Sequence, residues 1–188
     1  MLLAALLLTA LQLSPSDGAP ILGPSGLSSH ADSVTVYDGG ARQLDVSVPR
    51  VSGADISIDG RLDEAAWLDA AVLTGFTQFS PIEGSTPSEN TTVRVIITDD
   101  AFLFAIRADD RSGGVRATLT ERDGYGRSDD YVRVVLDTFN DQRRAYVFMV
   151  NPLGVQADGL WVAGGSGRFG DPIDWSPDFL WQSSGRVD

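Results

Sequence analysis

The chain has 188 residues, of which 14 are basic and 26 acidic, giving a formal net charge of −12; it contains no cysteine and one histidine. The composition therefore excludes disulfides and Cys-ligated metal centres, and it argues against nucleic acid as a partner, because an acidic chain lacks the basic surface that supplies most nucleic-acid affinity. Hydrophobic residues make up 43% and charged residues 21%, which is the balance of a folded globular domain.

The chain opens on an apolar run. Residues Met1 to Leu13 are too few to cross a bilayer as a helix, and turn-rich sequence follows as far as Pro20. This pattern predicts a secretory signal peptide over residues 1–19, and hence an exported protein that is periplasmic, associated with the outer membrane or extracellular. Asp17 is an unfavourable feature for cleavage after Ala19, and the alternative is a buried N-terminal helix.

Residues 20–50 are predicted to form an arm. The sequence is rich in Gly, Ser and Pro as far as about Arg42, and a short strand is predicted at Val34 to Tyr37. The single histidine, His30, lies in this arm. A Ser–His–Asp or Cys–His mechanism needs a histidine held rigidly beside its nucleophile, so we do not expect that class of catalysis.

From residue 51 onward most predicted elements are strands. One short helix of about two turns is predicted at Leu62–Ala71, with Trp67 facing the core. Two apolar, β-branched runs at Thr91–Thr98 and Ala101–Ala108 are separated by two turn residues, Asp99-Asp100, and they predict a β-hairpin.

A second hairpin is predicted from Tyr131–Asp137 and Arg144–Asn151, followed by a further strand at Val155–Trp161. Residues 146–150 are apolar on both faces, which predicts a central strand. No strand is predicted after Trp181, so we expect the sequence to stop inside its domain. Many short strands and one short helix predict an antiparallel, jelly-roll-like β-sandwich over residues 51–188.

Several motifs follow one another in order between Ile56 and Trp181. They are Ile56-Ser-Ile-Asp-Gly-Arg-Leu-Asp-Glu-Ala-Ala-Trp67, Phe76-Thr-Gln-Phe79 with Pro81 and Glu83-Gly84, Thr92-Val-Arg-Val95, Ser128 to Asp141, and Tyr146 to Asp158. Together they resemble a family 9-like carbohydrate-binding module, of the type that opens larger exported bacterial proteins. The resemblance implies a β-sandwich that binds polysaccharide or oligosaccharide, that takes part in carbohydrate catabolism, and that often holds structural calcium.

A sugar site needs flat apolar rings to stack on pyranose C–H faces and planar polar groups to bind hydroxyls. The candidate rings are Trp161 and Trp175, and for both the alternative is a packing role. The candidate polar groups are Gln78, Glu83, Arg94 and Arg107, for which the alternative is an ordinary solvated sheet face. Trp181 is assigned to packing.

Calcium takes six to eight oxygen ligands, which aspartate and asparagine side chains on loops can supply. The candidate ligands are grouped around the predicted strand that begins at Tyr131 and the turn that follows it. They are Asp129, Asp130, Asp137, Asn140 and Asp141. The alternative for Asn140 and Asp141 is a plain turn pair.

Three functions are open. The first is non-catalytic carbohydrate binding that tethers an exported polysaccharide-degrading or glycan-uptake protein to its substrate. The second is a structural or interaction sandwich that packs on a downstream β-rich domain of the same protein. The third is an O-glycosyl hydrolase, which requires two carboxylates across a cleft, and the sequence does not place any two carboxylates opposite each other.

Overall fold

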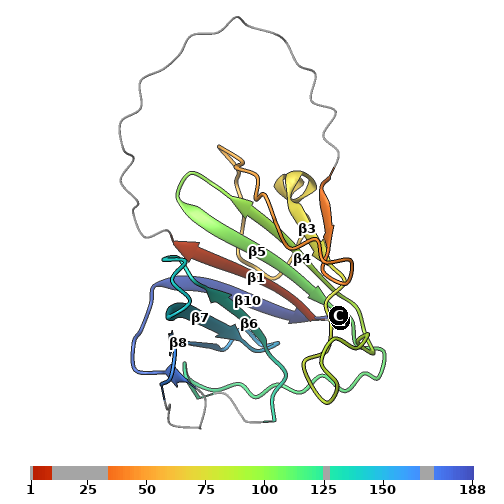
Figure 1. Cartoon of the computed structure of the whole chain (residues 1–188). Coiled ribbons are helices and arrows are strands. Elements are labelled where there is room, and N and C mark those ends of the chain that lie inside the picture. The colour runs from red at the N-terminus through yellow and green to blue at the C-terminus, as the bar shows by residue number, and fades with distance from the viewer. Residues whose placement is uncertain (1, 10–33, 125–127, 166–171) are drawn as a thin grey trace, which may run out of the picture.

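The computed structural model describes residues 2–9, 34–124, 128–165 and 172–188. These residues form two mostly antiparallel sheets and one short 3-10 helix, η1 (Ala65–Asp69), and the sheets pack against each other (Figure 1). The predicted β-sandwich is confirmed. Among the described residues no helix is long and apolar enough to span a membrane.

The larger sheet has the strand order β10-β1-β5-β4-β3-β2 and the smaller sheet has the order β6-β7-β8-β9. All neighbouring strands are antiparallel except β2 and β3. The larger sheet consists of β1 (Leu2–Thr9), β2 (Val36–Asp38), β3 (Ala71–Thr74), β4 (Thr91–Ile97), β5 (Ala101–Ala108) and β10 (Trp181–Val187). The smaller sheet consists of β6 (Val132–Leu136), β7 (Arg144–Val150), β8 (Gln156–Val162) and β9 (Ile173–Asp174).

The core between the sheets comes from the alternation of apolar residues on both predicted hairpins. In the β4–β5 hairpin, Val95 pairs with Phe104 and presents one apolar face inward. In the smaller sheet, Phe148 and Val150 on β7 meet that face. Because β7 lies between β6 and β8, it is buried along most of its length, as its doubly apolar sequence predicts.

Trp67 anchors a second apolar cluster on the opposite side of the larger sheet, and its predicted core position is confirmed. Its side chain is 3% exposed and packs with Ile96 and Leu103. The predicted helix is shorter than two α-helical turns, because Ala70 is already extended and the chain passes directly into β3, which pairs with β4.

β10 was not predicted from the sequence. Residues Trp181–Val187 form a seven-residue strand, whereas no strand was predicted after Trp181. The segment contains serine, glutamine and glycine, which carry little strand signal. It is held instead by backbone pairing along β1 and by the buried Trp181 ring, which packs edge-on against Phe148.

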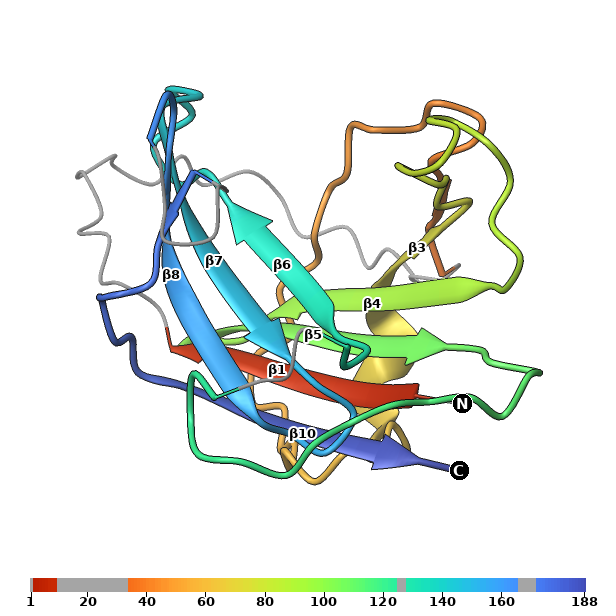
Figure 2. The ribbon, with the colours of Figure 1, turned by 90° about the horizontal axis from the view of Figure 1, so that it is seen from below.

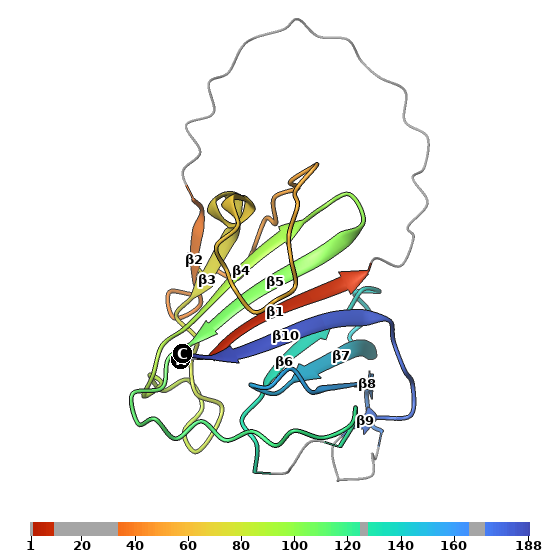
Figure 3. The ribbon, with the colours of Figure 1, turned by 180° about the vertical axis from the view of Figure 1, so that it is seen from behind.

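The N-terminal segment Leu2–Thr9 is a strand, so the alternative of a buried N-terminal helix is wrong. β1 lies between β5 and β10 and pairs with both (Figure 2). The view from behind shows the same order, with β10 and β5 on either side of β1 (Figure 3). The signal peptide stays a prediction. The short strand of the arm is confirmed as β2, whereas His30 lies outside the described residues.

Candidate functional site

The outward face of the smaller sheet carries one of the two predicted tryptophans, and the other follows the edge strand of that sheet. Alternation along β6 turns Val132, Val134 and Leu136 toward the core and Arg133 and Val135 outward. Cross-strand pairing continues this outward face over β7 and β8 to β9. We call it the tryptophan face, and it consists of Tyr131, Arg133, Val135, Asp137, Gln142, Arg144, Ala145, Val147, Trp161, Ile173 and Trp175.

Arg133 stands at the centre of the aromatic part of this face. Its guanidinium carbon lies 5.4 Å from the Tyr131 ring centroid and 5.8 Å from the Trp175 ring centroid, within the range of cation–π attraction. Its Nη2 also lies 3.7 Å from Sδ of Met149 on β7. The guanidinium is therefore held by two rings and a thioether.

Trp161 lines an open depression of about 390 Å³ on the same face. Its ring is half-buried, and four polar side chains share the depression: Arg133, Asp137, Gln142 and Arg144. Arg133 comes from β6 and Arg144 from β7, while Asp137 and Gln142 come from the turn between them. The Trp161 indole ring thus lies in the same depression as three planar hydrogen-bond donors and the carboxylate acceptor of Asp137.

The Asp137 carboxylate is oriented by the turn that follows β6. Its oxygens accept backbone N–H groups from Gln142 at 2.8 Å, Phe139 at 3.2 Å and Asp141 at 3.4 Å. These hydrogen bonds, that from Gln142 foremost, lower the pKa of Asp137 below its ordinary value. The group is therefore ionised at neutral pH.

The two predicted sugar-binding arginines, Arg94 and Arg107, both lie on the larger sheet. Thr92 pairs with Arg107 and Arg94 pairs with Ala105, so the two arginines are diagonal neighbours on β4 and β5. Both line a depression of about 560 Å³ that also includes Asn90, Asp109 and Phe76. We call it the arginine groove. The Arg107 Nε donates to Asp109 Oδ1 at 3.3 Å.

Gln78 and Glu83 belong to the loop between β3 and β4. The backbone N–H of Gln78 donates to Ser85 O at 2.8 Å, and its carbonyl accepts from Gly84 at 2.9 Å. Glu83 is exposed, and neither side chain lines the arginine groove. The structure therefore separates the predicted polar set, which belongs to the larger sheet and its β3–β4 loop, from the predicted tryptophans on and beside the smaller sheet.

The five predicted calcium ligands lie at the two ends of β6, so they cannot all bind one ion. At the first end, Asp129 is buried and accepts hydrogen bonds from Thr118 N, Thr118 Oγ1 and Asn151 Nδ2. Asp130 accepts from Arg116 N at 2.8 Å. These carboxylates tie the segment before β6 to the rest of the sandwich.

At the second end of β6, Asp137 and Asp141 accept backbone N–H groups of their own turn, and Asn140 adopts a positive φ of 51°. The N–H groups of the turn donate to these carboxylate oxygens and so hold the turn in place. No group of three or more His, Cys, Asp or Glu side chains that could hold a metal ion occurs within the described parts of the chain. Calcium binding stays a prediction.

Four members of the tryptophan face were not predicted from the sequence: Tyr131, Arg133, Gln142 and Arg144. Arg133 carried a usable signal, because it alternates with inward-facing valines on a predicted strand. Gln142 carried none, since its place depends on the left-handed backbone of the turn, with φ of 55°. The Gly-rich segment between Trp161 and Trp175 lies largely outside the described residues, which end at Gly165 and resume at Pro172.

Comparison with known proteins adds no family: no family model, no curated protein and no solved structure matches the chain.

Proposed function

We propose that this protein binds carbohydrate, without catalysis, on the tryptophan face. The observation that supports this most directly is the depression in which Trp161 lies beside three planar side chains, Arg133, Gln142 and Arg144. An indole ring offers a flat apolar surface for the C–H face of a pyranose, and guanidinium and amide groups can bind neighbouring hydroxyls in pairs.

Each polar group has a role in this proposal. The two guanidiniums and the Gln142 amide donate to sugar oxygens, while the ionised Asp137 carboxylate accepts from a hydroxyl. The volume of about 390 Å³ lies near the lower end of the range for small-molecule sites, roughly 300–1,000 Å³. We therefore propose that the face binds a short stretch of glycan and so raises the concentration of an attached exported protein at its polysaccharide.

A glycan array followed by titration calorimetry on the best ligand tests this proposal. Trp161→Ala should weaken binding by about 30-fold or more, the loss expected when an anchoring aromatic residue is removed. Trp161→Phe keeps a flat ring and should retain part of the affinity. The matched control is Arg94→Ala with Arg107→Ala, which alters the arginine groove and should leave binding unchanged.

The arginine-groove control also defines the result that would contradict the proposed position of the sugar site. If the arginine-groove variant loses binding while Trp161→Ala keeps it, the tryptophan face is not the sugar site. If the folded wild-type chain binds no glycan on the array, carbohydrate binding itself is wrong and the interaction sandwich becomes the better hypothesis. Thermal unfolding of every variant separates a lost contact from a lost fold.

A further inference from the structure

β1 occupies an unusual position, because the first strand of the chain lies inside a sheet otherwise built from distant segments. Seven of its residues pair with β10, from Leu2 opposite Val187 to Leu8 opposite Trp181. Eight pair with β5, from Leu2 opposite Ala108 to Thr9 opposite Ala101. Both pairings are antiparallel, so β1 links β10 to the remainder of the larger sheet.

The same residues form the apolar core of the predicted signal peptide. Cleavage after Ala19 would remove every residue of β1, whereas the folded sheet uses all of them. The segment Leu2–Thr9 is therefore needed to complete the sheet, yet cleavage of the predicted leader would remove it.

Removal of β1 would leave two unpaired strand edges facing each other. In the described part of the chain β10 has no strand partner besides β1, and β5 would keep only β4. Leu103 and Ala105 on β5 are almost fully buried, as is Trp181 on β10. Two parallel rows of unsatisfied backbone groups beside buried apolar residues form a template for an added strand.

We propose that the space between β5 and β10 is a strand-acceptor site, filled by Leu2–Thr9 in the uncleaved chain and opened when the leader is removed. The occupant to which this site is suited is an uncharged extended segment of about eight residues, antiparallel to both neighbours. Residues 2–9 meet that description, since all are leucine, alanine or threonine. Cleavage of the leader would thus leave a gap between β5 and β10, which could bind a segment such as Leu2–Thr9 again.

Cysteine cross-linking tests the register in the full chain, and it is unambiguous because the wild-type sequence has no cysteine. Ala5 lies opposite Ser184, so Ala5→Cys with Ser184→Cys should form a disulfide under mild oxidation. The control is Thr9→Cys with Ser184→Cys, in which the first position lies four residues farther along the strand, about 13 Å away. Absence of the first cross-link in folded protein, or equal yields for both pairs, would overturn the proposal.

Exchange of the N-terminal fragment for an added peptide tests whether the space between β5 and β10 can bind a strand. A protease site introduced between Leu13 and Pro20 allows the folded full chain to be cut, after which native mass spectrometry follows the N-terminal fragment. We expect a labelled peptide of residues 2–9 to replace that fragment in one-to-one stoichiometry. The same peptide with Leu6→Lys should not, because its charge would be placed opposite the buried Phe104 of β5.

The stability of the cut protein completes the test. Displacing the fragment without a replacement should lower the melting temperature, and adding the residue 2–9 peptide should restore it. A cut protein that loses the fragment and keeps its melting temperature would show that the sheet does not need a strand at this position, and the proposal would then be wrong.

Discussion

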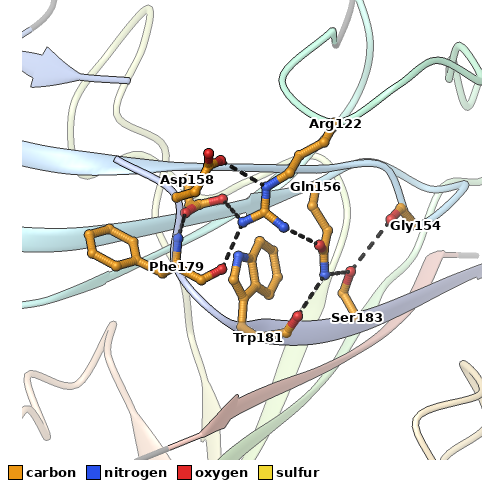
Figure 4. Close-up of polar contacts among 8 residues, drawn as sticks. Arg122, Gly154, Gln156, Asp158, Phe179, Trp181 and Ser183 are labelled. Atoms are coloured by element: carbon orange, nitrogen blue, oxygen red, sulfur yellow. Dashed lines mark hydrogen bonds and ion pairs between the residues drawn. The ribbon is translucent and has the colours of Figure 1, made fainter. Parts of the chain in front are cut away.

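The Arg122 guanidinium forms an ion pair with Asp158, a carboxylate that is completely buried on the inward side of β8 (Figure 4). Asp158 also accepts the backbone N–H of Phe179 at 2.6 Å. Arg122 donates in addition to Gln156, whose amide donates to Ser183 Oγ on β10 at 3.0 Å. Through Gln156, this arginine therefore connects β8 of the smaller sheet to β10, an edge strand of the larger sheet.

Removing the Arg122 guanidinium should lower the stability of the fold. Arg122→Met keeps the apolar stem but leaves the Asp158 charge buried without its cation, and we expect a loss of about 3 kcal/mol in the free energy of unfolding. Asp158→Asn should cost less, because an amide oxygen can still accept from Phe179. The double variant should cost less than the sum of the two single ones, since both remove the same contact.

Urea unfolding followed by tryptophan fluorescence measures these free energies. The control is Arg61→Met, which breaks an exposed 4.0 Å pair with Asp59 and should change stability by less than about 1 kcal/mol. Equal losses for Arg122→Met and Arg61→Met would show that the buried pair does not stabilise the junction between the sheets.

A second prediction concerns Asn151, which is 1% exposed and faces Asp129. Its Nδ2 donates to Thr118 O at 3.0 Å and to Asp129 Oδ2 at 3.3 Å, while its Oδ1 accepts from the N–H groups of Leu153 and Val155. Asn151→Asp keeps both accepted hydrogen bonds but sets two carboxylates against each other. We expect a loss of about 3–5 kcal/mol at pH 7, because the pair cannot ionise freely while buried.

The loss should depend on pH in a defined direction. Repulsion raises the folded-state pKa of the new carboxylate pair, so stability returns as the pH falls below that raised value and is lost as the pH rises through it. Thermal unfolding of Asn151→Asp between pH 4 and pH 8 measures this, with Asn151→Ala as the control that lacks a titrating group. A pH-independent difference between wild type and Asn151→Asp would contradict the explanation.

The fold could be predicted from sequence where one strand face is apolar and the other polar. The β4–β5 hairpin and β6 followed this rule, because short turns and alternating residues determine the register locally. β10 could not be predicted in this way. Gln182 to Gly185 have little strand propensity, and they are extended because their backbone pairs with β1, which is distant in the sequence.

The candidate site was predictable only in part. Trp161 and Trp175 could be identified by residue type, and the structure places both near Arg133. Sequence spacing gave no means of knowing that Arg94 and Arg107 lie on the other sheet, since assignment of strands to sheets depends on long-range pairing. The grouping of aromatic and polar residues into one site was therefore an assumption that sequence alone could not test.

A third prediction concerns the pH dependence of stability at Asp137. Its folded pKa is lowered from an ordinary value of about 3.9, chiefly by the Gln142 N–H, so its stabilising contribution is present above that ordinary value. The contribution is lost as the pH falls through the lowered folded pKa. Asp137→Asn should therefore be less stable than wild type at pH 7, and the difference should shrink as the pH falls below about 3.9.

Denaturant unfolding at pH 7 and at pH 3 checks this prediction. Asp63→Asn removes an exposed charge from the loop before η1, outside both sheets, and controls for the change in net charge. A deficit for Asp137→Asn that grows toward low pH would reverse the expected sign and show that the turn hydrogen bonds do not stabilise the charged form.

The last prediction concerns Trp67, whose Nε1 donates to Glu64 Oε2 at 2.9 Å while its ring fills the cluster beneath η1. Trp67→Ala removes a large, 3% exposed side chain and should cost about 3–5 kcal/mol, a large share of the 5–15 kcal/mol that stabilises a typical domain. Trp67→Phe keeps a ring but loses the hydrogen bond, so it should cost less. Leu68→Ala, at a neighbouring side chain that is 69% exposed, should change stability by less than about 0.5 kcal/mol. Thermal and urea unfolding of the three variants would contradict this if Leu68→Ala cost as much as Trp67→Ala, because burial at η1 would then not be the cause.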